Sequence, residues 1–350
     1  MLGELVPQRH WGFDRVTLQG ARALGAPRTA PPPFLAGPLP EVTTPLVELD
    51  DLVRFAEHPV KAFLRQRLGI MLGDFTEEVG DALTVELDHL EQWGVGTRLL
   101  EGRLAGAEMD ACVAAEVARG LLPPGRLGEP VIARLRPTVE ELAGYALRLG
   151  EGAPRSADVK VALGDGRILS GTVPGIHGDL LRVVQYSRVA AKHRIALWVR
   201  WLALTAAYPD RPIQAVLMGR AASGAQGPVT ICRLPAVGAD AARERLAVLL
   251  DLHRRGLREP LPIACASSAA YARQGEGPAR KAWESEWNFP KEDVEPEHQL
   301  AFGGVLSFDE LLARPPRDGE DFEPDEPTRF GRLSKRLWGG VRACEELAEG

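Results

Sequence analysis

The order of helical and strand patterns between residues 138 and 255 is the feature that most restricts the fold of this chain. Thr138 and Glu141 have the spacing of a capping box, which predicts a helix that begins there and ends near Gly150. Apolar periodicity and a glycine-rich turn at 164–166 predict the elements that follow. These are strands at 158–163, 167–176, 180–186, 212–218 and 229–234, and helices at 189–207 and 239–255. The order α-β-β-β-α-β predicts an α/β fold, with a mixed central sheet flanked by helices.

The segments on either side of this core differ from it in composition. Prolines recur between Pro27 and Pro45, which is typical of an extended arm or linker. From Glu284 to Glu326, fourteen acidic residues are present against three basic ones. The predicted divisions are an extended, Pro-rich arm at 1–46, an N-terminal helical part at 47–135, the α-β-β-β-α-β core at 136–275, and an acidic, helical C-terminal extension at 276–350.

Two of the core strands carry short motifs, Gly171-Thr-Val-Pro174 and Val183-Val-Gln-Tyr-Ser187. With the element order, they resemble the core of the restriction-endonuclease-like, or PD-(D/E)XK, nucleases. In those enzymes the first of these strands carries Asp, and the second carries an acid, one spacer residue and Lys. Residues i and i+2 of a strand point to the same face, so that acid and Lys flank one pocket. There the carboxylates hold Mg²⁺, which activates the attacking water.

The residues that carry this chemistry are replaced in the present chain. By the resemblance, Pro174 stands at the position of the metal-binding Asp, Gln185 at that of the second acid, and Ser187 at that of the Lys. A neutral amide and a hydroxyl do not supply the anionic oxygens that Mg²⁺ prefers, and neither replaces an ammonium group. We therefore predict a degenerate nuclease centre, with no catalytic residue and no metal site.

The alternative is a Mg²⁺-dependent DNA nuclease whose carboxylates have moved to new positions. Asp158, Asp165 and Asp179 lie near the two motifs in the sequence, and His177 and His193 are also available. This interpretation requires two of the three carboxylates to converge on one metal ion. The turn accounts for Asp165, and the loop that enters the third strand accounts for Asp179, so this alternative ranks second.

Several other function classes lack support in the sequence. No glycine-rich loop of the type G-x-x-x-x-G-K-[ST] is present, so the chain is not expected to hydrolyse ATP. The four cysteines are scattered without a C-x-x-C pair, which argues against zinc and disulfides. No signal-peptide pattern opens the chain, and the longest apolar stretch is interrupted by Arg200 and shorter than the ~20 residues of a membrane span. We expect a cytoplasmic protein without membrane contact.

Positive charge is concentrated in one segment of the core. Residues 182–220 contain seven Lys or Arg and a single acid, Asp210. Such a segment is typical of a surface that meets a polyanion such as DNA. Arg188, Lys192 and Arg194 follow the third core strand, and we predict that they contact phosphates. The alternative is that they lie on an exposed helix face without a nucleic-acid role.

Segments outside the core motifs resemble the RecC family. Residues Leu49–Leu68 fit the RecC pattern L-x-x-L-x-R-F-x-x-x-P-x-x-x-F-x-x-x-R-L. The segments Arg119–Glu129 and Pro260–Tyr271 are similar to further parts of that family, so the resemblance spans nearly the whole chain. It identifies residues 47–275 as the RecC C-terminal, nuclease-like domain.

The resemblance implies a non-catalytic role in the RecBCD enzyme, exodeoxyribonuclease V, which acts in double-strand break repair by homologous recombination. In the family this region contacts the RecB and RecD subunits, binds double-stranded DNA ends and the separated strands, and contributes the pin that helps to split the duplex. Mg²⁺ and ATP would be used by the partner subunits, and no cofactor is expected here. The loop from Gly219 to Pro228 is a candidate for the pin, against the alternative of a plain surface loop.

Overall fold

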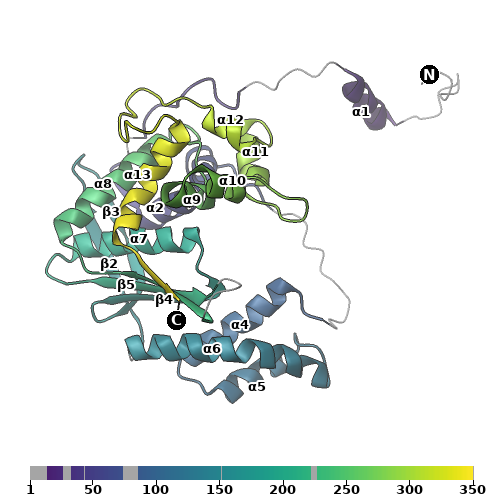
Figure 1. The fold of residues 1–350 in the computed structure, drawn as a ribbon, viewed down its shortest axis with the longest axis vertical. Coiled ribbons are helices and arrows are strands. Elements are labelled where there is room, and N and C mark those ends of the chain that lie inside the picture. Colours follow the sequence, from purple (N-terminus) through teal and green to yellow (C-terminus); the bar gives the residue numbers. More distant parts are fainter. Residues whose placement is uncertain are drawn as a thin grey trace.

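A seven-stranded mixed sheet lies between two helical layers in the computed structural model (Figure 1). The structure describes residues 14–26, 33–42, 44–73, 86–150, 152–221 and 227–349. Strands β2 to β4 form an antiparallel meander, and β5 runs parallel to β4 and antiparallel to β6. Their bounds are β2 (Arg155–Ala162), β3 (Ile168–His177), β4 (Leu180–Arg188), β5 (Gln214–Arg220) and β6 (Val229–Leu234). The predicted mixed α/β sheet is confirmed.

The turn between β2 and β3 forms where the glycine-rich signal predicts it. Gly166 has a φ of +85°, a conformation that glycine adopts without steric cost. Leu163 N donates to Arg167 O over 2.9 Å, and Asp165 Oδ1 accepts from Arg167 N over 3.1 Å. These bonds close the hairpin and fix the register of the two strands.

A parallel connection joins β4 to β5 through helix α7 (Ala191–Ala207). Parallel neighbours need such a crossover because the chain must return to the end of the sheet where the first strand began before the second strand can run in the same direction. Helix α7 is apolar on most sides, and Trp198 and Trp201 are almost completely buried. A helix with this composition belongs in the interior, where it packs between the sheet and the outer helices.

The prediction of a capping box at Thr138 is wrong, because helix α6 (Glu129–Leu149) begins at Glu129 and continues through Pro137. Pro130 occupies the first turn, where a missing N–H costs no helical hydrogen bond. The apolar face of α6 extends on both sides of Pro137 and packs against the sheet, which keeps the helix continuous. The predicted boundary between 135 and 136 therefore falls inside one helix.

Two hydrophobic layers enclose the sheet. On one face α6 packs with α4 (His89–Leu104) and α5 (Met109–Arg119), and their core includes Tyr186 and Met218 of the sheet. The other face is covered by α7 and by helices from both halves of the chain (Figure 1). These are α2 (Leu49–Glu57), α8 (Ala239–Gly256), α9 (Cys265–Gln274) and α13 (Arg329–Cys344).

The C-terminal segment is part of this second layer. Its apolar side chains, among them Trp283, Phe308, Phe330 and Trp338, are buried in the same core as α7. The helices before α13 are α10 (Glu276–Trp283), α11 (Pro296–Phe302) and α12 (Phe308–Leu312), with a short 3-10 helix at Glu292–Val294. After α13, β7 (Glu346–Glu349) pairs antiparallel with β6. The segment thus completes one edge of the sheet, which its acidic composition did not predict.

The N-terminal segments are attached in different ways. Strand β1 (Leu46–Glu48) pairs in parallel with β3, and α2 is followed by α3 (Pro59–Ala62) and a π-helical turn at Phe63–Arg67. Within the Pro-rich arm, residues 33–42 lie against the body, where Leu39 exchanges hydrogen bonds with Arg258 over 2.8 and 3.1 Å. Helix α1 (Arg15–Gly25) has no buried side chain. Among the described residues, no helix combines the length and apolar composition that a membrane crossing requires.

Candidate functional site

Pro174 lies at an irregularity of β3. The pairing of β2 with β3 shifts its register between Arg155 and Ala157, and Pro174 and Gly175 occupy the β3 side of that shift. Gly175 has a φ of +83°, which favours glycine, and Pro174 is exposed. Proline has no N–H and is tolerated in a sheet at such a bulge. The position therefore offers neither a carboxylate nor a regular strand geometry.

Gln185 joins the end of β4 to the start of α7. Its Nε2 donates to Arg188 O over 3.1 Å and lies 2.7 Å from His193 Nδ1. Ala190 N also donates to His193 Nδ1, over 3.2 Å, and Arg188 O lies 3.2 Å from the same ring nitrogen. Burial lowers the pKa of His193, and Lys192 lowers it further. The pair is therefore an uncharged amide and an uncharged imidazole.

Ser187 accepts a hydrogen bond from a residue of the helical part. Trp93 Nε1, from α4, donates to Ser187 Oγ over 2.7 Å. Helix α4 approaches β4 so closely at this point that a side chain at Gly96 would overlap the Tyr186 ring. The hydroxyl that stands at the expected lysine position thus accepts a hydrogen bond from a neutral indole.

The end of β4 is not a regular strand either. Val184 pairs with Met218 and Arg188 with Arg220, so three residues of β4 stand opposite Gly219 alone. A side chain at Gly219 would overlap the Ser187 carbonyl. A bulge of this kind changes the direction of the side chains, so the simple i, i+2 argument does not apply to Gln185 and Ser187. We call Gln185 and Ser187, with His193 and Trp93, the neutral centre, whereas Pro174 belongs to the bulge of β3.

The three aspartates of the alternative interpretation have separate partners. Asp158 Oδ1 accepts from Thr172 Oγ1 over 2.6 Å, and Asp179 Oδ1 accepts from Arg211 Nε over 2.8 Å. Hydrogen bonds from Arg167 lower the pKa of Asp165 in its turn. His177 and Asp179 line one cavity of about 390 Å³, but Asp158 and Asp165 are not among its lining residues. Within the described residues, none of the three belongs to a group of three or more potential metal ligands.

The described residues contain one such group elsewhere, made by His58, Glu295 and His298. His58 lies between α2 and α3, while Glu295 and His298 begin α11. His58 Nε2 is 3.0 Å and His298 Nδ1 is 3.2 Å from Glu295 Oε2, and the two imidazole rings stack at 4.7 Å. The sequence analysis missed this cluster, because its members are far apart in the chain and have no motif spacing.

Hydrogen bonds with the backbone show how the two rings of this cluster are held. His58 Nδ1 accepts from Lys61 N over 3.1 Å, so the proton is on Nε2 and points to Glu295. His298 Nδ1 lies 2.6 Å from Glu292 O and must carry a proton, because a carbonyl only accepts. Burial alone would raise the pKa of Glu295, but these two histidines lower it to about 2. A metal ion would have to displace a proton and the Lys61 bond, so the residues fit an ionic tie between α3 and α11 better than a metal site.

The three predicted phosphate contacts are in different environments. Arg188 is exposed at the end of β4. Lys192 is also exposed, and it lines a cavity of about 750 Å³ together with Glu57 and Glu295. Burial raises the pKa of Glu57 there, against the effect of Arg200 and Lys192.

Arg194, by contrast, is not part of an open surface. It forms a bidentate ion pair with Glu345, with Nε 2.8 Å from Oε2, and its side chain is 13% exposed. Its guanidinium also lies over the Trp338 ring. This arginine ties α7 to the end of α13, which leaves Arg188 and Lys192 as the accessible pair.

Other cations of the segment 182–220 also have protein partners. Arg182 is buried and donates to Ala146 O and Gly150 O over 2.5 and 2.7 Å, at the end of α6. Arg211 pairs with Asp179 at 2.7 Å, and Arg200 is 3.7 Å from Asp50. The excess of positive charge that the sequence shows is therefore partly neutralised within the fold.

Comparisons with known proteins agree with the resemblance found in the sequence. Residues 44–276 match the family profile described as the RecC C-terminal domain. The RecBCD enzyme subunit RecC of Mycolicibacterium smegmatis is 40% identical over 342 residues, which cover 96% of this chain and 31% of that protein. The protein of the same name from Mycobacterium tuberculosis is 36% identical over 98% of the chain, and that from Escherichia coli is 24% identical over 67%.

The chain spans about a third of the length of the mycobacterial relatives that it matches, 31% in each case. The family profile covers the segment from just before β1 to the end of α9, and the match to the mycobacterial proteins includes the C-terminal helices as well. The chain belongs to the RecC family and corresponds to its C-terminal region.

Proposed function

We propose that this chain is the non-catalytic C-terminal module of a RecC subunit in a RecBCD enzyme, exodeoxyribonuclease V. In this role it holds the RecB and RecD subunits, binds the DNA end and the separated strands, and helps to split the duplex during double-strand break repair by homologous recombination. The relatives are named as subunits of the RecBCD enzyme, which supports assembly with other chains.

The neutral centre is the observation that carries the non-catalytic part of the proposal. A nuclease of the resembled type needs two carboxylates and a lysine around Mg²⁺. Here Pro174 offers no side-chain oxygen, while Gln185 and Ser187 are bound to His193 and Trp93 through uncharged hydrogen bonds. Any Mg²⁺ or ATP that the whole enzyme uses would then be bound by its other subunits.

Arg188 and Lys192 support the DNA-binding part of the proposal. Both are exposed, Arg188 as the last residue of β4 and Lys192 in the first turn of α7, so their charges are near the neutral centre. Contacts of this type bind the phosphate backbone without reading the sequence. The loop from Gly219 to Pro228 remains a prediction for the pin, and its residues 222–226 lie outside those that the structure describes.

Digestion of labelled linear duplex DNA tests the proposal. The purified chain alone is incubated with Mg²⁺ or Mn²⁺, and then together with RecB and RecD. We expect no cleavage by the chain alone, and binding of the chain to the other two subunits. Full-length RecC in place of the chain is the control for processive degradation by the mixture.

Cleavage by the chain alone would contradict the proposal. If that activity disappeared in Asp158→Ala, Asp165→Ala or Asp179→Ala, the carboxylates would have moved, as in the alternative nuclease. A chain that neither cleaves DNA nor binds RecB or RecD would contradict the subunit role itself.

A further inference from the structure

A short turn with two exposed aromatic side chains follows helix α10. Trp287 is 99% exposed and Phe289 is 65% exposed, and we call residues 286–289 the aromatic turn. The other tryptophans of the C-terminal segment, Trp283 and Trp338, are completely buried. Single exposed apolar residues are common on protein surfaces. Here two aromatic side chains are exposed within one turn, so their value for binding depends on how firmly the backbone holds them.

The backbone of the aromatic turn is fixed. Glu286 N donates to Phe289 O over 3.2 Å, and Phe289 N donates back to Glu286 O over 3.0 Å. Lys291 Nζ lies 2.8 Å from Glu286 Oε1, which ties the outgoing strand of the turn to its first residue. These contacts close a loop of two residues, with Trp287 in it.

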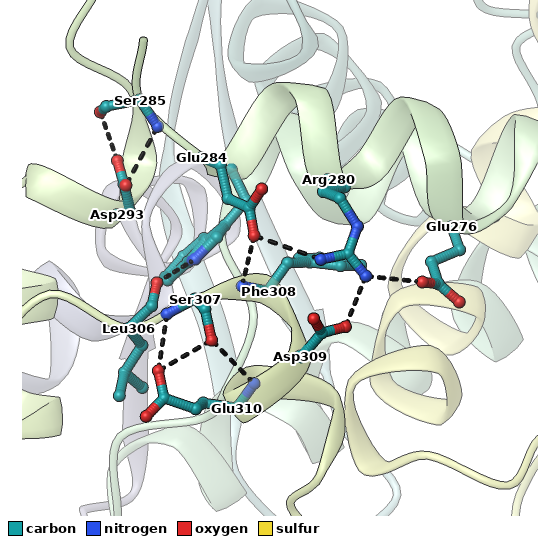
Figure 2. A network of polar contacts seen from close by, with 11 residues as sticks. Glu276, Arg280, Glu284, Ser285, Asp293, Leu306, Ser307, Phe308, Asp309 and Glu310 are labelled. Carbon is teal, nitrogen blue, oxygen red and sulfur yellow. Dashed lines mark hydrogen bonds and ion pairs between the residues drawn. The ribbon is translucent and has the colours of Figure 1, made fainter. Parts of the chain in front are cut away.

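Polar contacts around the buried Asp293 hold the base of the turn in place (Figure 2). Asp293 is 7% exposed, and its carboxylate accepts from Ser285 N over 3.0 Å and from Ser285 Oγ. Ser285 Oγ in turn accepts from Lys291 N over 2.7 Å. The residue before Ser285 joins α10 to α12, because Glu284 Oε1 accepts from Phe308 N over 2.9 Å and from Arg280 over 3.3 Å.

This arrangement has a consequence for binding. A rigid element loses little conformational freedom when it binds, so more of its contact energy appears as affinity. Tryptophan is also the residue type most typical of binding hot spots, because one side chain buries a large area. A rigid turn that presents Trp287 and Phe289 is therefore built to enter an apolar pocket of another molecule.

The charge of the segment around the aromatic turn indicates which class of molecule binds it. Of the fourteen acidic residues from Glu284 to Glu326, five are buried and seven are exposed, against three basic residues, of which Lys291 is paired with Glu286. Such a surface repels the phosphates of a nucleic acid. It attracts a protein surface with lysine or arginine at its rim, and this complementarity increases the association rate.

We propose that the aromatic turn is a docking element for a partner protein that offers an apolar pocket with a basic rim. Trp287 occupies the pocket, Phe289 covers its edge, and the surrounding carboxylates pair with the rim. The inference rests on the proposed function, since it locates one contact between this chain and another subunit of the enzyme.

The test measures binding of the complete 350-residue chain to purified RecB and RecD, by calorimetry or interferometry. We expect Trp287→Ala to weaken binding about 10-fold to 100-fold, as for a hot-spot residue, and Phe289→Ala to weaken it less. Leu127→Ala is the matched control, because Leu127 is 58% exposed but lies near the start of α6. Since Trp287 makes almost no contact within the chain, its variant should keep the thermal stability of the unmodified chain.

Two further readouts identify the partner class. Subtracting the emission spectrum of Trp287→Phe from that of the unmodified chain gives the emission of Trp287. Its maximum should shift to shorter wavelength in the complex, because the indole leaves water. Affinity should fall as salt is added, and Glu286→Gln should reduce that salt dependence.

The outcomes separate the two proposals. If the unmodified chain binds RecB and RecD and Trp287→Ala binds equally well, the docking element is overturned while the proposed function stands. If Trp287→Ala loses binding to single-stranded DNA but keeps the subunits, the turn contacts nucleic acid and the inference is also overturned. Failure of the unmodified chain to bind either subunit overturns both.

Discussion

The neutral centre at the end of β4 and a cluster of ion pairs near the start of α13 both join distant parts of the chain, but they use different interactions. In the neutral centre, hydrogen bonds link uncharged groups, such as Trp93 to Ser187. In the second region, Arg329 bonds to Glu320 over 2.8 Å and to Glu259 over 2.7 Å. We call Glu259, Glu320 and Arg329 the C-terminal ion cluster.

The two regions differ in whether they bury charged groups. Arg329 is 5% exposed and Glu320 is 2% exposed, so each needs the other to remain ionised inside the protein. The resemblance to nucleases drew attention to the neutral centre, where no charge remains. The C-terminal extension at 276–350 was predicted only to be acidic and helical, and part of that acidic charge, such as Glu320, lies inside the protein. Charge counted along a sequence does not show whether it is buried.

The largest expected effect is on the C-terminal ion cluster. Arg329→Ala leaves Glu320 buried without its partner, so we expect the free energy of unfolding to fall by about 3–5 kcal/mol. Urea denaturation measures the change. Arg317→Ala is the matched control, because Arg317 pairs with the same Glu259 at 2.7 Å but is 48% exposed, and it should cost less than about 1 kcal/mol. Equal losses in both variants would contradict the assigned role of burial.

The ionic tie at Glu295 should make stability depend on pH. Its pKa in the folded chain, about 2, is below its usual value of 4.5. The stabilisation is therefore complete above about pH 4.5 and is lost as the pH falls towards 2. Because the side chain is 41% exposed, screening reduces the contribution to roughly 1–2 kcal/mol. The difference in melting temperature between the chain and Glu295→Gln should be smaller at pH 3 than at pH 7, and an unchanged difference would refute the tie.

The neutral centre should show a smaller effect. Trp93→Phe keeps the aromatic ring and removes the hydrogen bond to Ser187, and we expect a loss of about 1 kcal/mol. Ser187→Ala should cost a similar amount, and the double variant little more than either one, because both delete the same bond. Additive losses in this double-mutant cycle would show that the two residues are not coupled.

The smallest effect concerns DNA. If Lys192 contacts a phosphate, Lys192→Gln should weaken binding to all sequences alike and reduce the slope of log affinity against log salt by about 1. Arg211→Gln is the control, since Arg211 is paired with Asp179 within the fold. Filter binding or anisotropy at several salt concentrations measures both. An unchanged slope for Lys192→Gln would remove this residue from the DNA surface.

Much of the fold could be predicted because local patterns and tertiary packing agree. The alternation in β3 places Leu169 and Val173 in the core, and the glycine-rich turn before it forms as expected. Strand β7 could not be predicted in this way. Its Glu346-Leu-Ala-Glu349 pattern has little strand character, and it becomes a strand because β6 offers an unpaired edge. The start of α6 was missed because Pro137 resembles a helix boundary in sequence.

The sequence by itself determined which chemical groups are present at three positions of β3 and β4. No fold can give Pro174, Gln185 or Ser187 a carboxylate or an ammonium group, because residue identity fixes the side-chain chemistry. Tertiary structure alone decided which polar groups are paired. Trp93 meets Ser187 across 94 residues, and Arg194 meets Glu345 across 151. Such partners are brought together by the packing of whole helices and strands, and a hydrogen bond depends on their final distance, which spacing along the chain does not record.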